Sequence, residues 1–86
     1  MPEISRFFGI VIKMFFDDHA PPHFHVEYGG EKAVFDFRAL IVIRGSLSPR
    51  VLGLVVEWAA QHQSEFLDLW ERASKSQALY KVPPLK

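Results

Sequence analysis

A pair of glycines, Gly29–Gly30, separates two runs in which apolar and polar residues alternate, FHVEY and EKAVFDF. A two-residue glycine loop between such runs predicts a tight β-hairpin, because the turns that match the twist of paired strands need positive φ angles. The loop fixes the register if Tyr28 faces Glu31. Glu27 then faces Lys32, and opposite charges at directly opposed positions favour this pairing.

This register assigns the side chains of the hairpin to two faces of a sheet. One face is apolar and predicts a core, with Phe24, Val26, Ala33 and Phe35. The other face is polar and is expected to stay open, with His23, His25, Glu27, Lys32 and Asp36. On this open face His23 lies opposite Asp36, and Glu27 and Lys32 are candidate contacts for a ligand or partner.

The N-terminal segment, residues 4–16, also alternates and is rich in β-branched and aromatic residues. It predicts one long strand or two strands joined near Gly9. One phase, interrupted by Arg6, contains Ile4, Phe8, Ile10, Ile12, Met14 and Phe16. Residues 40–44, LIVIR, predict a further strand after a tight turn near Arg38 and Ala39.

The second half of the chain has the periodicity of a helix. Ser48 is a suitable N-cap, and Pro49 suits the first helical position. An apolar stripe with three- and four-residue steps follows, made of Val51, Val55, Trp58, Ala59, Phe66, Leu69, Trp70 and Ala73. The stripe predicts either one long helix or two helices broken near residues 61–64, with Ser64 capping the second. We favour the break, because a single long helix would overhang a small sheet.

These elements predict a single α+β domain over residues 1–86. It has a three- or four-stranded, mainly antiparallel sheet and a C-terminal helix or helix pair packed on one face. Hydrophobic residues make up 49% of the chain, which is enough for a core. The 10 basic and 10 acidic residues balance, so only a local basic patch could attract nucleic acid.

The chain has no cysteine, which excludes a disulfide framework and zinc sites with thiolate ligands. Its first residues, MPEISRFF, do not have the pattern of a signal peptide. No apolar run approaches the roughly 18 residues that indicate a membrane span. We therefore expect a cytoplasmic protein that does not insert into membranes.

Three of the 4 histidines lie close together in the segment DDHAPPHFHVEY, residues 17–28. His23 and His25 flank Phe24 and therefore leave the same face of the predicted strand. His19 precedes them in a connector that a double proline makes rigid. The carboxylates nearby are those of Asp17, Asp18 and the cross-strand Asp36.

One interpretation of this segment is catalysis. Histidine exchanges protons near neutral pH, so His23 and His25 are a candidate acid–base pair for cleavage of RNA without a metal, with His19 assisting. Asp36 is the candidate group that orients the ring of His23. The candidate cations for the phosphate are Lys13 and Arg38.

A second interpretation is a site for a divalent transition metal, held by His19, His23 and His25 with an aspartate. A third is structural: the aspartates bind turn amides, the prolines stiffen the connector, and the histidines lie on a polar sheet face. The residues alone leave all three interpretations open.

The run MPEISRFFGIVIKMFFDDHAPPHFHVEYGGEKAVFDF resembles the start of a small bacterial family catalogued as domain of unknown function 4160, in which PPHFH is a specific motif. The run LSPRVLGLVVEWAAQHQSEFLDLWERA is similar to the helical part of that family. The resemblance covers nearly the whole chain. It implies a genetic context, because members are commonly encoded beside a protein catalogued as domain of unknown function 2442, and the pairing looks like a toxin–antitoxin arrangement.

The resemblance and the histidine segment together lead to two expectations about function. The first is a small cytoplasmic toxin-like component of a two-gene module, which acts on RNA and is held in check by a partner protein from a neighbouring gene. The alternative is a non-catalytic interaction or regulatory module, in which the open face, with or without a metal, binds the partner. The balanced charge favours the alternative slightly. A homo-oligomer is compatible with both.

Overall fold

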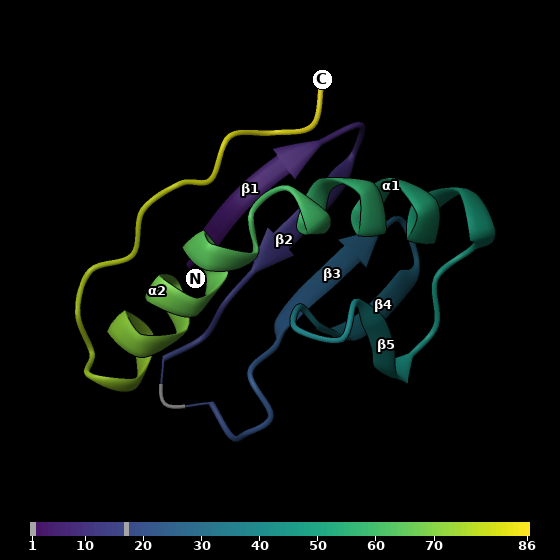
Figure 1. Ribbon diagram of the computed structural model, residues 1–86. Helices are drawn as coiled ribbons and strands as arrows, with labels where there is room; N and C mark the ends of the chain where they lie inside the picture. The colour runs from purple at the N-terminus through teal and green to yellow at the C-terminus, as the bar shows by residue number, and fades with distance from the viewer. Residues whose placement is uncertain (1, 17) are drawn as a thin grey trace.

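The computed structural model describes residues 2–16 and 18–86. Its elements are, in chain order, β1 (Glu3–Phe7), β2 (Ile10–Lys13), β3 (Phe24–Tyr28), β4 (Glu31–Asp36), β5 (Ile41–Gly45), α1 (Pro49–Ala60) and α2 (Gln63–Ser74). The strands form one antiparallel sheet in the order β1-β2-β3-β4-β5 (Figure 1). The predicted α+β layout is confirmed. The sheet has five strands instead of three or four, because β1 and β2 are separate and β5 also joins.

The β3–β4 hairpin has the predicted register. Phe24 pairs with Phe35, and Glu27 pairs with Lys32. Gly29 has a φ of +55°, a left-handed conformation that glycine adopts without steric cost. The apolar face of the hairpin is buried, as the alternation predicts.

The β1–β2 hairpin turns at Phe8 and Gly9, both of which have positive φ. Phe7 is only 5% exposed, whereas Phe8 is 57% exposed and Phe16 is 44% exposed. The predicted apolar phase is therefore wrong at Phe8 and Phe16. A register shift near the start of β1 and the tight turn interrupt the alternation at Phe8, and β2 already ends at Lys13.

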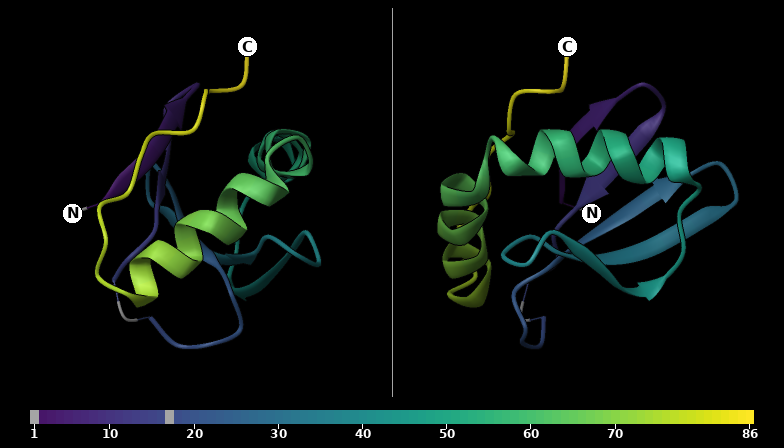
Figure 2. Two further views of the ribbon diagram at one scale, coloured as in Figure 1. Left: turned by 60° about the vertical axis from the view of Figure 1, so that its left-hand side comes forward. Right: turned by 45° about the vertical axis from the view of Figure 1, so that its right-hand side comes forward.

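The two helices cover one face of the sheet and run in different directions (Figure 2). The break between them falls within the predicted interval, but His62 and not Ser64 is the N-cap of α2. Ser48 and Pro49 begin α1 as predicted. The backbone N–H of Ser48 donates to the carboxylate of Glu31 over 2.7 Å, which ties the start of α1 to the sheet. Among the described residues, neither helix has the length and hydrophobicity needed to cross a bilayer.

An aromatic cluster joins the sheet to both helices. The ring centroid of Phe24 on β3 lies 5.1 Å from that of Phe35 on β4. It also lies 5.8 Å from Trp58 on α1 and 5.2 Å from Phe66 on α2. All these side chains are fully buried. Since burying one large apolar side chain contributes about 1.5–3 kcal/mol, the cluster holds the two layers together and fixes the strand that carries the histidines.

The C-terminal tail packs beside β1 (Figure 1). The backbone N–H of Val82 donates to the carbonyl oxygen of Ile4 over 2.7 Å, and Val82 is buried. The indole N–H of Trp58 donates to the carbonyl oxygen of Pro83 over 2.8 Å. The tail therefore closes the core at the β1 edge of the sheet.

The close approach at Gly45, the last residue of β5, generates a stability prediction. Gly45 has a φ of +77°, and a Cβ there would lie 2.3 Å from the carbonyl oxygen of Lys32. We expect Gly45→Ala to reduce the free energy of unfolding by more than about 1 kcal/mol, because the backbone conformation and the contact both oppose a side chain. Urea unfolding followed by circular dichroism measures the change.

Gly53→Ala is the matched control for this substitution. Gly53 lies inside α1, and a Cβ there would meet no atom within 4 Å. The control should increase the free energy of unfolding by about 0.5–1 kcal/mol, because alanine is the better helix former. Similar effects of the two substitutions would contradict the close approach at Gly45.

Candidate functional site

The carboxylate of Asp18 joins the imidazoles of His23 and His25. Its Oδ2 lies 2.9 Å from Nε2 of His23 and 3.0 Å from Nε2 of His25. Its Oδ1 accepts a hydrogen bond from the backbone N–H of His19 at 3.1 Å. One donor atom from each of Asp18, His23 and His25 lies within 4.8 Å of the other two. We call these three residues the Asp–His cluster.

Two features of the sequence bring the cluster together. His23 immediately precedes β3 and His25 is its second residue, so the extended chain directs both side chains to the same side. The connector of residues 18–22 folds back over that side, where the carbonyl oxygen of Pro21 lies 2.6 Å from Nδ1 of His23. The two histidines leave the same side of the chain as predicted, since both rings reach one oxygen of Asp18. The prediction that His23 lies on an open face is wrong, because Trp70 of α2 covers its ring and leaves it buried.

Asp18 is held in its charged form. Partial burial raises its pKa, but the hydrogen bonds from His25 and from the backbone N–H of His19, together with the contacts of His23, outweigh that effect. The pKa of Asp18 is consequently lower than that of an ordinary aspartate. At neutral pH an anionic carboxylate lies between the two imidazoles.

The contacts of His23 then require a positive charge beside Asp18. A carbonyl oxygen only accepts hydrogen bonds, so Nδ1 of His23 donates its hydrogen to Pro21. In a neutral ring, Nε2 would direct a lone pair at the anionic oxygen 2.9 Å away, which is repulsive. Either a second proton on His23 or a bound cation makes this geometry favourable.

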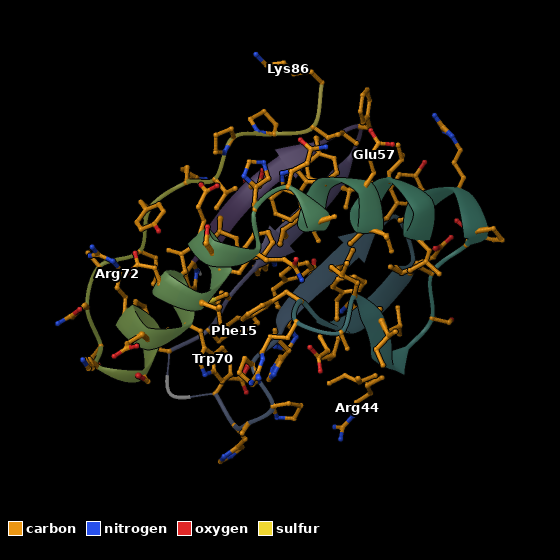
Figure 3. All side chains as sticks on the ribbon, in the orientation of Figure 1. Phe15, Arg44, Glu57, Trp70, Arg72 and Lys86 are labelled. Carbon is orange, nitrogen blue, oxygen red and sulfur yellow. The ribbon has the colours of Figure 1, made fainter. Side chains whose placement is uncertain are left out.

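Aromatic rings fix the orientation of both imidazoles. His23 is only 7% exposed, and its ring centroid lies 5.1 Å from that of Trp70 on α2. The ring of His25 lies against Phe15, edge to face, with 4.6 Å between the centroids. Phe15 and Trp70 are both labelled in Figure 3. Because neither imidazole can turn without displacing an aromatic neighbour, the cluster is preorganised.

The donor set of the Asp–His cluster fits a divalent transition metal. Imidazoles and carboxylates are ligands of zinc, iron, nickel and copper. A histidine that ligates a metal usually donates its other ring N–H to a carbonyl or carboxylate, and the bond from His23 to Pro21 is such a contact. Three protein ligands leave coordination positions open for water or a ligand.

The cluster lines a pocket of about 220 Å³ on the open face of the sheet. The other residues that line this pocket are His19, Ala20, Pro21, Val34, Ile43 and Arg44. A second hollow of about 290 Å³ adjoins it and shares His25, Val34 and Arg44 with it. A ligand can therefore reach the cluster from solvent.

His19 lies beside the cluster and is not part of it. Its side chain is exposed and lines the pocket, but the third donor next to His23 and His25 belongs to Asp18. Of the three metal ligands predicted from the sequence, His23 and His25 lie together with Asp18, whereas His19 lies outside this group. Asp17, the other carboxylate of the connector, lies outside the described residues.

Asp36 does not orient His23 as predicted. Its Oδ1 accepts hydrogen bonds from the backbone N–H groups of Arg38 at 2.8 Å and Ala39 at 3.0 Å, so it stabilises the β4–β5 turn. Arg38 is exposed on that turn, away from the residues that line the pocket. The ring of His23 contacts Asp18 instead, because the connector brings that carboxylate closer.

The remaining predicted residues lie on the open face. Nζ of Lys13 lies 3.1 Å from Oε2 of Glu27, so these two charges compensate each other. Lys13 also pairs with His25 across β2 and β3. Lys32 lines the second hollow together with Glu27.

Two residues at the site, Arg44 and Trp70, are absent from the predicted set. Arg44 pairs with Val34, which pairs with His25, so the register of β3, β4 and β5 would have placed Arg44 beside the cluster. Trp70 has no such indication in the sequence, because its contact with His23 depends on the direction of α2.

Fold and site together define a small α+β domain with a candidate metal centre on the open face of its sheet. The chain belongs to the family described as Domain of unknown function (DUF4160), whose model matches residues 9–71 and so includes the whole Asp–His cluster. This match confirms the family indicated by the PPHFH motif. No match was found among curated proteins, and none among solved structures. The function must therefore be argued from the site itself.

The unequal burial of the two histidines predicts unequal effects on stability. We expect His23→Ala to reduce the free energy of unfolding by about 1–3 kcal/mol, because it leaves the Pro21 carbonyl without its donor and opens a gap beside Trp70. His25→Ala should cost less than about 1 kcal/mol, because the side chain of His25 is 29% exposed. Urea unfolding in the presence of EDTA tests both variants. Equally small losses would contradict the burial of His23.

Proposed function

We propose that the protein is a binding module that holds a divalent transition metal at the Asp–His cluster and presents it to a ligand on the open face of the sheet. One observation carries this proposal: Oδ2 of Asp18 contacts Nε2 of both His23 and His25, while Nδ1 of His23 is bonded to the Pro21 carbonyl. The Nε2 atoms of both rings are therefore directed at the same carboxylate oxygen, so three donor atoms lie close together.

Each residue of the cluster has a distinct part in the proposal. Asp18 supplies the negative charge that attracts a cation. His23 supplies a rigid donor, since its ring is buried against Trp70. His25 supplies a donor at the mouth of the pocket, since its ring is partly exposed. A bound ion would act there as a Lewis acid toward a ligand oxygen or a water molecule.

A purely structural role explains these contacts less well. Burying ionisable groups costs free energy, and an apolar side chain at position 23 would pack against Trp70 without that cost. The two rings and the carboxylate also meet at a pocket that solvent reaches. Both features are typical of a site that binds something.

Zinc titration tests the proposal directly. After treatment with EDTA and dialysis, the wild-type protein should bind about one equivalent of zinc in isothermal titration calorimetry. Free zinc at 100 times its Kd should raise the free energy of unfolding by about 2.7 kcal/mol. Asp18→Asn and His25→Ala should each weaken zinc binding at least about tenfold, because the first removes the negative charge and the second removes an imidazole ligand.

His19→Ala and Asp36→Asn are the matched controls for this titration. Both residues belong to the set predicted from the sequence, but neither side chain is part of the cluster. Both variants should retain the zinc affinity of the wild type. The proposal is excluded if the wild type binds neither zinc, nickel nor cobalt, or if removing Asp18 leaves the affinity unchanged.

A second candidate function is that of a small cytoplasmic toxin-like component that cleaves RNA and is inhibited by a partner protein from a neighbouring gene. The position of His25 favours it. The side chain of His25 is 29% exposed and lines the same pocket as Arg44. Lys13 lies opposite His25 on β2, where it forms an ion pair with Glu27. An imidazole near cations suits proton transfer beside a phosphate. His23 is buried and bonded at both nitrogens, so His25 is the member of the predicted acid–base pair that a substrate can reach.

Induced expression in a bacterial host tests this second function. The wild type should inhibit growth, and His25→Ala should abolish the inhibition while the protein stays folded. His19→Ala tests the assisting role of the exposed histidine and should leave most of the inhibition in place. Growth inhibition that persists in His25→Ala would exclude the proposed chemistry, and a harmless wild type would leave the binding module as the better function.

A further inference from the structure

The two hollows of the open face adjoin each other, and we call them together the groove. They share His25, Val34 and Arg44, and the Asp–His cluster lies at one end while Glu27 and Lys32 lie at the other. Val34 pairs with His25 on one side and with Arg44 on the other. Because valine is shorter than both neighbours, it forms the floor of the groove and they form its sides.

Arg44 is the cation of the groove that is available to an anion at the cluster. It extends from β5 (Figure 3) and is exposed. No ion pair links it to another residue in the part of the chain that the structure describes. Lys13, by contrast, is already paired with Glu27. A guanidinium offers two parallel N–H donors, which match the oxygens of a phosphate or carboxylate.

The charge at this end of the groove depends on the metal. Without an ion, the negative charge of Asp18 offsets part of the positive charge that Arg44 and a second proton on His23 supply. A divalent ion that takes the place of this proton makes the sum more positive, and bound cations are often the largest charges in a site. The groove should therefore bind an anion more tightly when the metal ion is present.

We propose that the groove binds a phosphate ester, with one phosphate oxygen at an open position of the metal and another at the guanidinium of Arg44. This inference rests on the metal site proposed above and adds the class of ligand. A phosphate group carries several anionic oxygens on one tetrahedral centre, so it can bridge a metal and a guanidinium, as phosphates commonly do in metal-dependent sites. The groove continues past Arg44 to Lys32, which leaves room for the remainder of the ester.

A phosphate ester has two sources, the terminal monoester of a nucleotide and the diester of a nucleic-acid strand. Uridine 5′-monophosphate and the dinucleotide UpU represent them, and uridine is the control without phosphate. Each is titrated into wild-type protein loaded with cobalt, and binding is measured by calorimetry and by the visible absorption of the cobalt ion. The ester should bind and shift the cobalt spectrum, whereas uridine should do neither.

Substitutions of Arg44 test its part in the groove. Arg44→Ala should weaken ester binding about tenfold to a hundredfold, because a charge-assisted hydrogen bond is lost. Arg44→Lys should retain part of the affinity, because it keeps the charge but not the paired donors. Arg50→Ala removes an exposed arginine that lines neither hollow and should change nothing. All three variants should bind cobalt as the wild type does.

The outcomes separate this inference from the proposed function. If the wild type does not bind cobalt, the metal site fails and the phosphate site fails with it. If cobalt binds normally but Arg44→Ala binds the ester as well as the wild type, the inference is overturned while the metal site stands. Binding of uridine as tight as that of UpU would also overturn it. Tighter binding of UpU than of the monoester identifies the diester as the source, and the reverse result identifies the monoester.

Discussion

The alternation of side chains along β3 supports both the core and the site. Phe24 and Val26 are fully buried, whereas His25 and Glu27 leave the opposite face. A slip of one residue would exchange these faces, so the packing of Phe24 between both helices also holds His25 in place. The same packing therefore fixes the Asp–His cluster, in which His25 lies on the open face while Trp70 of α2 covers His23.

The parts of the fold that could be predicted are those where two features of the sequence agree. The Gly29–Gly30 loop and the alternation around it specify one register, and the structure has that register. In β1 the alternation is the single indication of register. A register shift in this strand and the tight turn after it make the prediction wrong at Phe8. The break between the helices could be located, but its cap could not, because His62 occupies that position without a side-chain capping bond.

The candidate site could also be predicted only in part. The spacing of His23 and His25 on a strand is enough to predict that they meet. The choice of the third donor among the neighbouring residues depends on the path of the connector, which the sequence does not specify. Backbone N–H groups and histidine rings compete for a carboxylate, and Asp36 accepts hydrogen bonds from the N–H groups of its own turn and not from His23. Arg44 could have been found once β5 was paired with β4.

The contact between His23 and Trp70 gives the protein an optical property. The chain has 2 tryptophans, and they occupy unlike surroundings. Trp58 is fully buried and its indole N–H is bonded to the tail. Trp70 lies with its ring centroid 5.1 Å from that of His23. Trp58 also lies beside a histidine, with 5.7 Å between its ring centroid and that of His62. A paramagnetic ion quenches indole emission at short range, so an ion at the cluster would lower the fluorescence of Trp70. The protein thus carries its own probe, and occupancy of the site can be followed without attaching a dye.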